Sequence, residues 1–286
     1  MTTATATRAA SATTSRRLNL AGVIRSEWIK ATSLRSIRWS IAVSIVLGIG
    51  MSTIMGFAIR DLIPPGTFGG AEFITTVTGF PSAFLALVFA VLGVFVFSSE
   101  YSSGMILSTL TAAPLRGRVL AAKALVLTAI SGAVAALILT AGVGIAVVLL
   151  PDAASALGTT EVISSLFGTL AYLVAIALMA FAIAGIVRST AGAVTTVVAI
   201  VFLLPMIAQI LTQVTDWTWV VWLNEYLPSA LGSTLSYGIG SEIPSMVAEQ
   251  SGVHVPQYWE ALGGLVLWVV VPMIVSVKLF FDRDAK

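Results

Sequence analysis

The residue types that carry enzyme chemistry are scarce in this sequence. It has no cysteine and one histidine, His254, so thiol chemistry and a histidine-rich metal site are excluded. Its long apolar runs contain no acid or base, which excludes paired carboxylates or an activated serine inside the membrane. The same lack of charged residues disfavours an ion-driven carrier, because such carriers typically hold the coupling ion with an acidic or basic side chain inside the membrane. A GxxxxGK[ST] phosphate loop is also missing, so energy for any transport would come from another protein.

The segment from Ser98 to Val126 collects charged and turn-forming residues between two apolar runs. Glu100 stands at its start, and Gly104 allows the chain to turn. Pro114 suits the first turn of a new helix, because its missing N–H would be unbonded there. The interval 105–110 between them predicts a short helix. Such a helix in the loop between two spans can transmit movement from another protein to the spans, or it can be a simple connector.

The interval 20–35, LAGVIRSEWIKATSLR, has the pattern of a basic amphipathic helix. Its apolar face gathers Leu20, Val23, Ile24, Trp28, Ala31 and Leu34. Arg25 and Lys30 lie off that face, so we expect the helix along the inner membrane surface. Glu27 falls within the apolar face, where a carboxylate is costly without a partner. Two alternatives remain for this partner: Lys30, one turn further along the same helix, or a residue of another cytoplasmic element.

The composition indicates an integral membrane protein, since 58% of residues are hydrophobic and 10% charged, against about 25% charged in soluble proteins. A crossing helix needs about 20 mostly apolar residues. Six runs meet or approach this length: about 39–59, 73–97, 124–150, 162–187, 191–214 and 259–279. We therefore predict an all-α protein with a disordered tail over 1–17, an amphipathic interface helix over 18–37 and a six-span domain over 38–286.

Charge placement predicts the orientation of these spans. With six crossings, every lysine and arginine except Arg60 falls on one side, and most acids fall on the other. The side rich in bases is cytoplasmic by the positive-inside rule. Both termini are therefore expected in the cytoplasm. The net charge of +2 gives no reason to expect a nucleic-acid partner.

The stretch 216–238, DWTWVVWLNEYLPSALGSTLSYG, is apolar enough to suggest a seventh span. Glu225 and Pro228 interrupt it, and a seventh crossing would place the basic C-terminus outside. We expect outer interfacial or re-entrant helices here, with Trp217, Trp219, Trp222 and Tyr226 at the level of the lipid headgroups.

Two stretches resemble the six-span type-2 permease subunits of ATP-binding-cassette (ABC) transporters, especially short actinobacterial ones. They are RSEWIKATSLRS, residues 25–36, and SSEYSSGMILSTLTAAPLRGRVLAAK, residues 98–123. In the second stretch the family's features are Glu100, Gly104, Leu110, Pro114, Arg116 and Lys123. Leu115 departs from the family, which often has a small polar residue after the proline. Span count and topology agree along nearly the whole chain.

The resemblance implies roles for these residues. The amphipathic helix, with Arg25, Glu27, Trp28 and Lys30, would be the interface helix, and 102–110 would be a coupling helix that docks in a cleft of a separate ATPase. The ATPase-coupling residues would be Glu100, Tyr101, Gly104, Met105, Ile106, Leu110, Pro114 and Arg116. By the same analogy the second and fifth spans line the substrate path, which places Phe202, Gln209 and Gln213 near substrate.

The expected function is therefore that of an exporter subunit in a bacterial plasma membrane. It would move a hydrophobic or amphipathic substrate, such as a drug, peptide or lipid-like molecule. This chain would hold no cofactor and would not itself be an enzyme, because the ATPase subunits bind ATP and Mg. A second permease copy or close homologue completes the complex. The alternatives are a membrane anchor or sensor in an ABC-like resistance complex and, more remotely, an ion-coupled secondary transporter.

Overall fold

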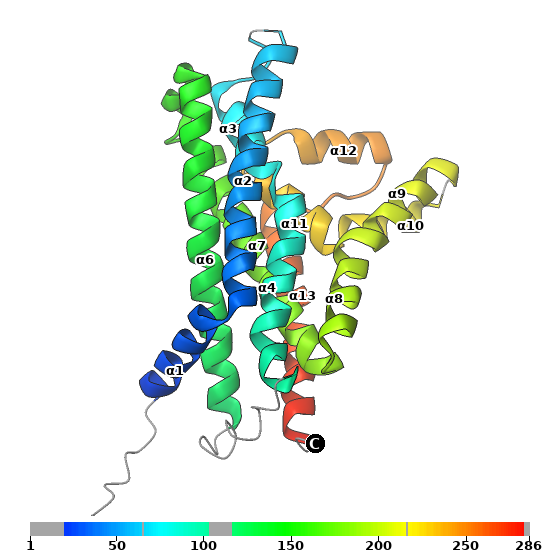
Figure 1. Ribbon diagram of the computed structural model, residues 1–286. Coiled ribbons are helices and arrows are strands. Elements are labelled where there is room, and N and C mark those ends of the chain that lie inside the picture. Colours follow the sequence, from blue (N-terminus) through cyan, green and yellow to red (C-terminus); the bar gives the residue numbers. More distant parts are fainter. Residues whose placement is uncertain (1–19, 65, 103–115, 216, 283–286) are drawn as a thin grey trace, which may run out of the picture.

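The described part of the chain is a bundle of long helices that run along a common direction (Figure 1). The computed structural model describes residues 20–64, 66–102, 116–215 and 217–282, and within these ranges every regular element is helical. In chain order the elements are α1 (Leu20–Ser33), α2 (Arg35–Leu62), α3 (Gly70–Gly79), α4 (Ser82–Ser102), α6 (Arg116–Leu149), η1 (Pro151–Ala156), α7 (Thr160–Val187), α8 (Thr190–Val198), η2 (Ala199–Leu203), α9 (Leu204–Val214), α10 (Thr218–Glu225), α11 (Pro228–Tyr237), α12 (Ile243–Ser251) and α13 (Tyr258–Asp282). The predicted all-α class is confirmed for these ranges.

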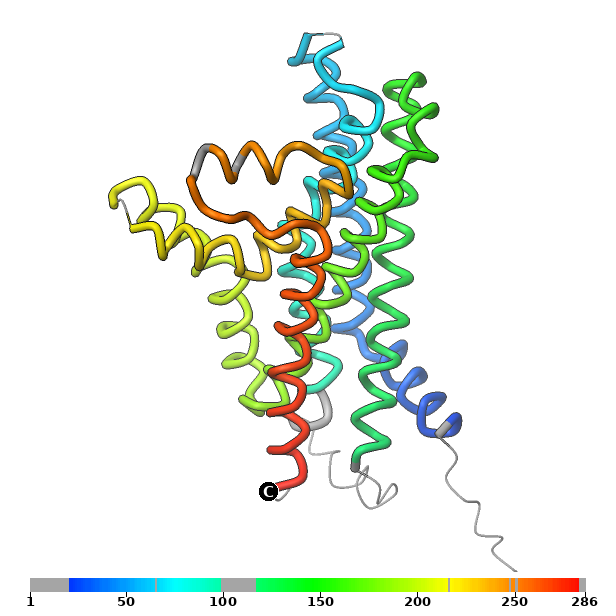
Figure 2. Tube along the Cα trace, turned by 180° about the vertical axis from the view of Figure 1, so that it is seen from behind, coloured from blue at the N-terminus to red at the C-terminus, as the bar shows by residue number. Residues whose placement is uncertain are grey.

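Six stretches are long and apolar enough to cross a bilayer, as predicted. They are Arg35–Leu62, Gly70–Ser98, Gly117–Leu149, Thr160–Val187, Thr190–Val214 and Tyr258–Asp282. Successive stretches run in opposite directions (Figures 1 and 2). As a result α1, the starts of α2, α6 and α8, and the end of α13 lie at one end of the bundle, which we call the basic end after the lysines and arginines of those segments. The opposite, far end carries α12 and a projecting arm made by α9 and α10.

The helix boundaries differ from the expected ones where the backbone is interrupted. Instead of one interface helix over 18–37, α1 ends at Ser33 and α2 begins at Arg35. Leu34 between them is extended, with φ −71° and ψ 125°, so α1 leaves the axis of α2 (Figure 1). The third span begins at Arg116 rather than 124, because the bases of its first turns remain helical.

Proline interrupts two further spans. The second span divides into α3 and α4 at Pro81, which cannot donate the hydrogen bond that would continue the helix. In the fifth span, Pro205 cannot donate to the carbonyl of Val201, and the preceding turn widens into the π-helical η2. Beyond this turn α9 leaves the bundle and returns as α10, which forms the projecting arm (Figures 1 and 2).

Helix α7 is the centre of the bundle and contacts α3, α4, α6, α8, α11 and α13. Two glycines allow its neighbours to approach its backbone. A side chain at Gly93 of α4 would collide with the carbonyl oxygen of Ala177 in α7. Likewise, a side chain at Gly168 of α7 would collide with the carbonyl oxygen of Leu235 in α11. Small residues are the usual means of such close helix contact in membranes.

A stripe of small residues on α2 has the same effect on a second helix pair. The buried face of α2 carries a serine or glycine at every fourth position: Ser40, Ser44, Gly48, Ser52 and Gly56. A side chain at Gly48 would meet Ile138 of α6, and one at Gly56 would meet Leu149 of the same helix. This four-residue period of small residues is present in the sequence and is a local signal of close helix contact.

The contact between α4 and α7 gives a test of this packing. We expect Gly93→Ala to lower the free energy of unfolding by about 1–3 kcal/mol, because the added methyl group cannot be accommodated against a backbone oxygen. The measurement is unfolding of the detergent-solubilised protein by titration with sodium dodecyl sulfate.

Gly144→Ala in α6 is the matched control, since a Cβ there meets no atom within 4 Å. It should leave stability unchanged or raise it by up to about 1 kcal/mol through helix propensity. Equal stability of the two variants would contradict the packing described for Gly93.

Candidate functional site

The segment expected to couple to an ATPase lies largely outside the described residues. Gly104, Met105, Ile106, Leu110 and Pro114 belong to the range 103–115, which the structure does not describe. Glu100 and Tyr101 belong to the last turns of α4 and Arg116 to the start of α6, but their side chains also lie outside the described part. Their coupling roles therefore stay predictions. The end of α4 and the start of α6, to which this segment is joined, lie at the basic end of the bundle (Figure 1).

Helix α1 lies across the first turns of α6 at this end (Figures 1 and 2). Val23 of α1 packs with Val119 and Ala122 of α6 in a small buried cluster. Trp28, which we placed on the apolar face, is 44% exposed instead. The buried face of α1 is therefore narrower than the sequence pattern, and it centres on Val23, Glu27 and Ala31. Arg25 is exposed, in agreement with its place off the apolar face.

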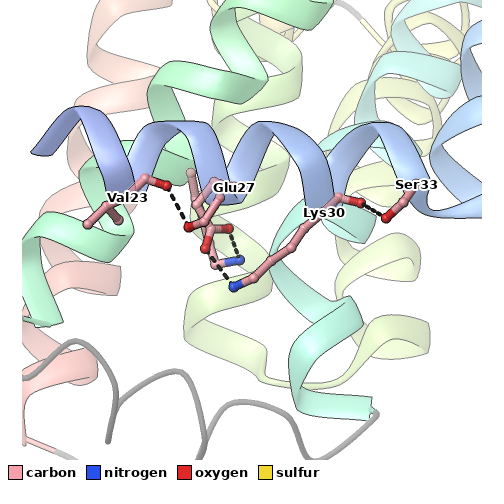
Figure 3. A network of polar contacts seen from close by, with 6 residues as sticks. Val23, Glu27, Lys30 and Ser33 are labelled. Carbon is pink, nitrogen blue, oxygen red and sulfur yellow. Dashed lines mark hydrogen bonds and ion pairs between the residues drawn. The ribbon is translucent and has the colours of Figure 1, made fainter. Parts of the chain in front are cut away.

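Glu27 is the charged residue at the centre of this contact and is only 4% exposed. Its Oε1 accepts a hydrogen bond from Nζ of Lys30 at 2.8 Å, within α1 (Figure 3). Its Oε2 accepts one from Nζ of Lys123 in α6 at 2.7 Å. A buried carboxylate is stable only when its charge and its oxygen lone pairs are satisfied. Two lysines do this here, and one of them joins α1 to α6.

Both partners considered for Glu27 are therefore present together. In the local pair Lys30 is about one third exposed, so this pair contributes little by itself. The pair with Lys123 is buried on both sides and connects residues 96 positions apart in the chain. Sequence reasoning named Lys123 as a base before the third span and as one of the features shared with type-2 permeases, but not as the partner of Glu27. An acid in an apolar stripe was the signal that a partner existed, but it did not identify which base.

A cavity of about 660 Å³ opens in the far half of the bundle. Its walls come from the start of α4, the middle of α7, the fifth span around η2, and α10 and α11. Phe202 and Gln209 line it, as do Asn224, Glu225 and Tyr237. Gln213, expected beside them, is not among the lining residues and is exposed on α9 one turn further along.

The electrostatics of this cavity centre on Glu225, at the last position of α10. Burial raises the pKa of this carboxyl above its ordinary value of 4.5, and a hydrogen bond with the Asn224 side chain opposes the rise only in part. Burial also raises the pKa of the Tyr237 phenol, and the nearby Glu225 charge adds to the effect. The Oδ1 atom of Asn224 is buried and accepts no hydrogen bond from the described residues. Sequence reasoning used Glu225 only as an interruption and missed Asn224 and Tyr237.

The outer helices α10 and α11 explain why the stretch 216–238 is not a span. They contain 8 and 10 residues, and a turn at Tyr226 and Leu227 separates them. Each is too short to cross a bilayer. Trp217 and Trp219 stack with ring centroids 5.9 Å apart on the arm. The two short helices instead bring Asn224 and Glu225 to the cavity.

The chain matches no protein-family model and no curated protein sequence. Among the described residues, acids and the histidine form no group of three or more that could hold a metal ion. Two places in the structure therefore bear on function: the ion-paired contact of α1 with α6 at the basic end, and the cavity at Glu225 in the far half.

Removing the charge of Glu27 should loosen α1 from α6. Loss of one partner of a buried ion pair costs about 3–5 kcal/mol. Even a third of this free energy would raise the population of chains with α1 detached about tenfold. Because the chain has no cysteine, Val23→Cys provides a single buried thiol at the contact. We expect Glu27→Gln to raise the rate of maleimide labelling at this thiol at least about tenfold.

Lys30→Gln serves as the comparison, because Lys30 is the more exposed partner of Glu27. It should change the labelling rate by less than about threefold. A labelling rate in Glu27→Gln equal to that of the parent would show that the ion pair does not hold α1 in place.

The raised pKa of Glu225 predicts a dependence of stability on pH. The folded chain binds this proton more readily than the unfolded chain, so the ionised carboxylate destabilises the fold above its folded pKa. Glu225→Gln should therefore melt at a higher temperature than the parent at pH 7.5. The difference should shrink as the pH falls towards 4.5.

Intrinsic tryptophan fluorescence in detergent reports this melting. Glu249→Gln, an exposed acid on α12, is the control and should not differ from the parent. A destabilised Glu225→Gln at pH 7.5 would contradict an unfavourable environment for the ionised group.

Proposed function

We propose that this chain is the membrane-spanning permease subunit of an ABC transporter. It exports a hydrophobic or amphipathic substrate with energy from separate ATPase subunits that bind ATP and Mg. The complex sits in a bacterial plasma membrane with the basic end in the cytoplasm, in keeping with the positive-inside rule. A second permease copy or close homologue completes it.

The observation that supports this proposal most is the ion pair between Glu27 and Lys123. The two stretches that resemble type-2 permeases, 25–36 and 98–123, are far apart in the sequence. Each stretch contributes one residue to this pair, although the first two spans lie between them in the chain. An interface helix pinned to the helix that follows the coupling segment can move together with that segment. This is the arrangement that a docked ATPase needs in order to act on the spans.

The far-half cavity adds a second line of support. Its volume of about 660 Å³ falls in the range of roughly 300–1,000 Å³ that accommodates small-molecule ligands. Phe202 and Gln209, which the family analogy places near substrate, are among its lining residues. The proposal therefore has a mechanical contact at one end of the bundle and room for a substrate towards the other.

A neighbouring reading frame that encodes a Walker-motif ATPase would supply the partner, and co-expression of the two proteins tests the proposal. The two proteins should co-purify, and the permease alone should hydrolyse no ATP. The double variant Met105→Ala with Ile106→Ala should weaken binding about thirtyfold, because an apolar anchor in a cleft contributes on the order of 2 kcal/mol.

Met246→Ala, on the exposed face of α12 at the far end, is the matched control and should bind normally. Normal ATPase binding and transport by the double variant would overturn the coupling role of this segment. Transport driven by an ion gradient in the absence of any ATPase would overturn the assignment as an ABC subunit.

A further inference from the structure

The lining of the far-half cavity includes a carboxylate without an ion-pair partner, that of Glu225, and a neighbouring amide whose oxygen lacks a donor, that of Asn224. Glu225 makes no ion pair with any residue that the structure describes. The neighbouring Asn224 Oδ1 is buried and likewise accepts no hydrogen bond from the described residues. The amide of Asn224 also makes a hydrogen bond to the Glu225 carboxylate, which leaves that carboxylate lining the cavity with one neutral donor and no opposite charge. A carboxylate that is partly buried without an opposite charge is costly, so the cavity offers this group to a cationic ligand.

The electrostatic surroundings of Glu225 also favour a cation as its ligand. Glu225 ends α10, where the helix dipole places partial negative charge, so a carboxylate at this position gains nothing from the helix. Most described bases lie at the opposite, basic end of the bundle. Arg60, the base of the far half among the described residues, lines a separate pocket beside Phe68 and Leu150. The described part of the protein therefore supplies no positive charge to this acid.

The rest of the cavity lining combines neutral polar side chains, such as Gln209 and Ser233, with a large apolar and aromatic part. Phe84, Phe202 and Met206 line one side, and Tyr172 and Tyr237 line the other parts. An inorganic cation would leave these side chains without a partner. An organic cation would use both parts of the cavity, because aromatic rings attract positive charge at their faces and pack against an apolar body.

We infer that this cavity binds amphipathic organic amines in their protonated form. The ammonium N–H groups donate to the Glu225 carboxylate, which the Asn224 amide helps to hold in place, and the apolar body packs against Phe202 and Met206. As a statement about the exported substrate, this inference rests on the proposed function. As a statement about binding, it rests on the cavity alone.

The experiment uses the full chain in lipid nanodiscs without an ATPase, with empty nanodiscs subtracted. The ligand is monodansylcadaverine, which carries a primary ammonium on an aromatic body, and its N-acetylated derivative is the neutral counterpart. Binding is followed by dansyl fluorescence polarisation at pH 7.5. The charged compound should bind at least about tenfold more tightly than the neutral one, a difference of about 1.4 kcal/mol.

Variants assign this preference to the cavity. Glu225→Gln keeps the shape of the side chain and should weaken binding of the charged compound at least about tenfold, with little change for the neutral one. Asn224→Leu should weaken binding of the charged compound less, since it removes a neutral hydrogen bond to the Glu225 carboxylate and leaves the charge in place. Glu249→Gln removes an exposed acid from the same end of the molecule and should bind as the parent does.

Equal affinity of the parent for the two compounds, or no binding of either, overturns the inference without reference to any variant. An unchanged affinity in Glu225→Gln also overturns it. Charge-dependent binding through Glu225 in a chain that never associates with an ATPase would sustain this inference and overturn the proposed function. ATP-driven export that shows no preference for amines would sustain the proposed function and overturn the inference that amines are the exported substrate.

Discussion

The close approach of helix backbones around α7 is the constraint on which the rest of the structure depends. Inside a bilayer the hydrophobic effect does not draw helices together, so packing and hydrogen bonds must do so. Gly93 against Ala177 and Gly168 against Leu235 bring α4 and α11 close to the α7 backbone. Ser165 of α7 also donates a hydrogen bond to the carbonyl oxygen of Ser236, which ties α11 to the bundle. The cavity has a fixed wall because this centre is closely packed.

The fifth span contrasts with this centre. It carries a π-helical turn before Pro205, and most of its surface is exposed within the single chain. A π turn changes the direction of a helix at low cost because its hydrogen bonds are kept with a longer spacing. The turn sends α9 and α10 outward and returns the chain so that Asn224 and Glu225 face Phe202. The cavity therefore lies between a closely packed wall and a wall whose position depends on one bend.

The two ends of the bundle differ in how their buried or partly buried acids are neutralised. At the basic end, Glu27 is neutralised by Lys30 and Lys123, and the pair fixes α1 on α6. In the far half, Glu225 has no such neutralisation from the described residues. The same residue type thus acts as a structural anchor in one place and as a binding group in the proposed mechanism in the other. The difference arises from whether the fold brings a base within hydrogen-bond distance.

The sequence by itself determined the all-α class, the six spans and the clustering of bases on one side, because hydropathy and charge are local properties that add along the chain. It also indicated that Glu27 required a partner. Only the tertiary structure decided that Lys123 is that partner, that Trp28 is exposed, and that Gln213 lies outside the cavity that Gln209 lines. It likewise gathered Asn224, Glu225 and Tyr237 with the fifth span. These outcomes depend on which helices meet and at what rotation, and that is set by packing between residues distant in sequence.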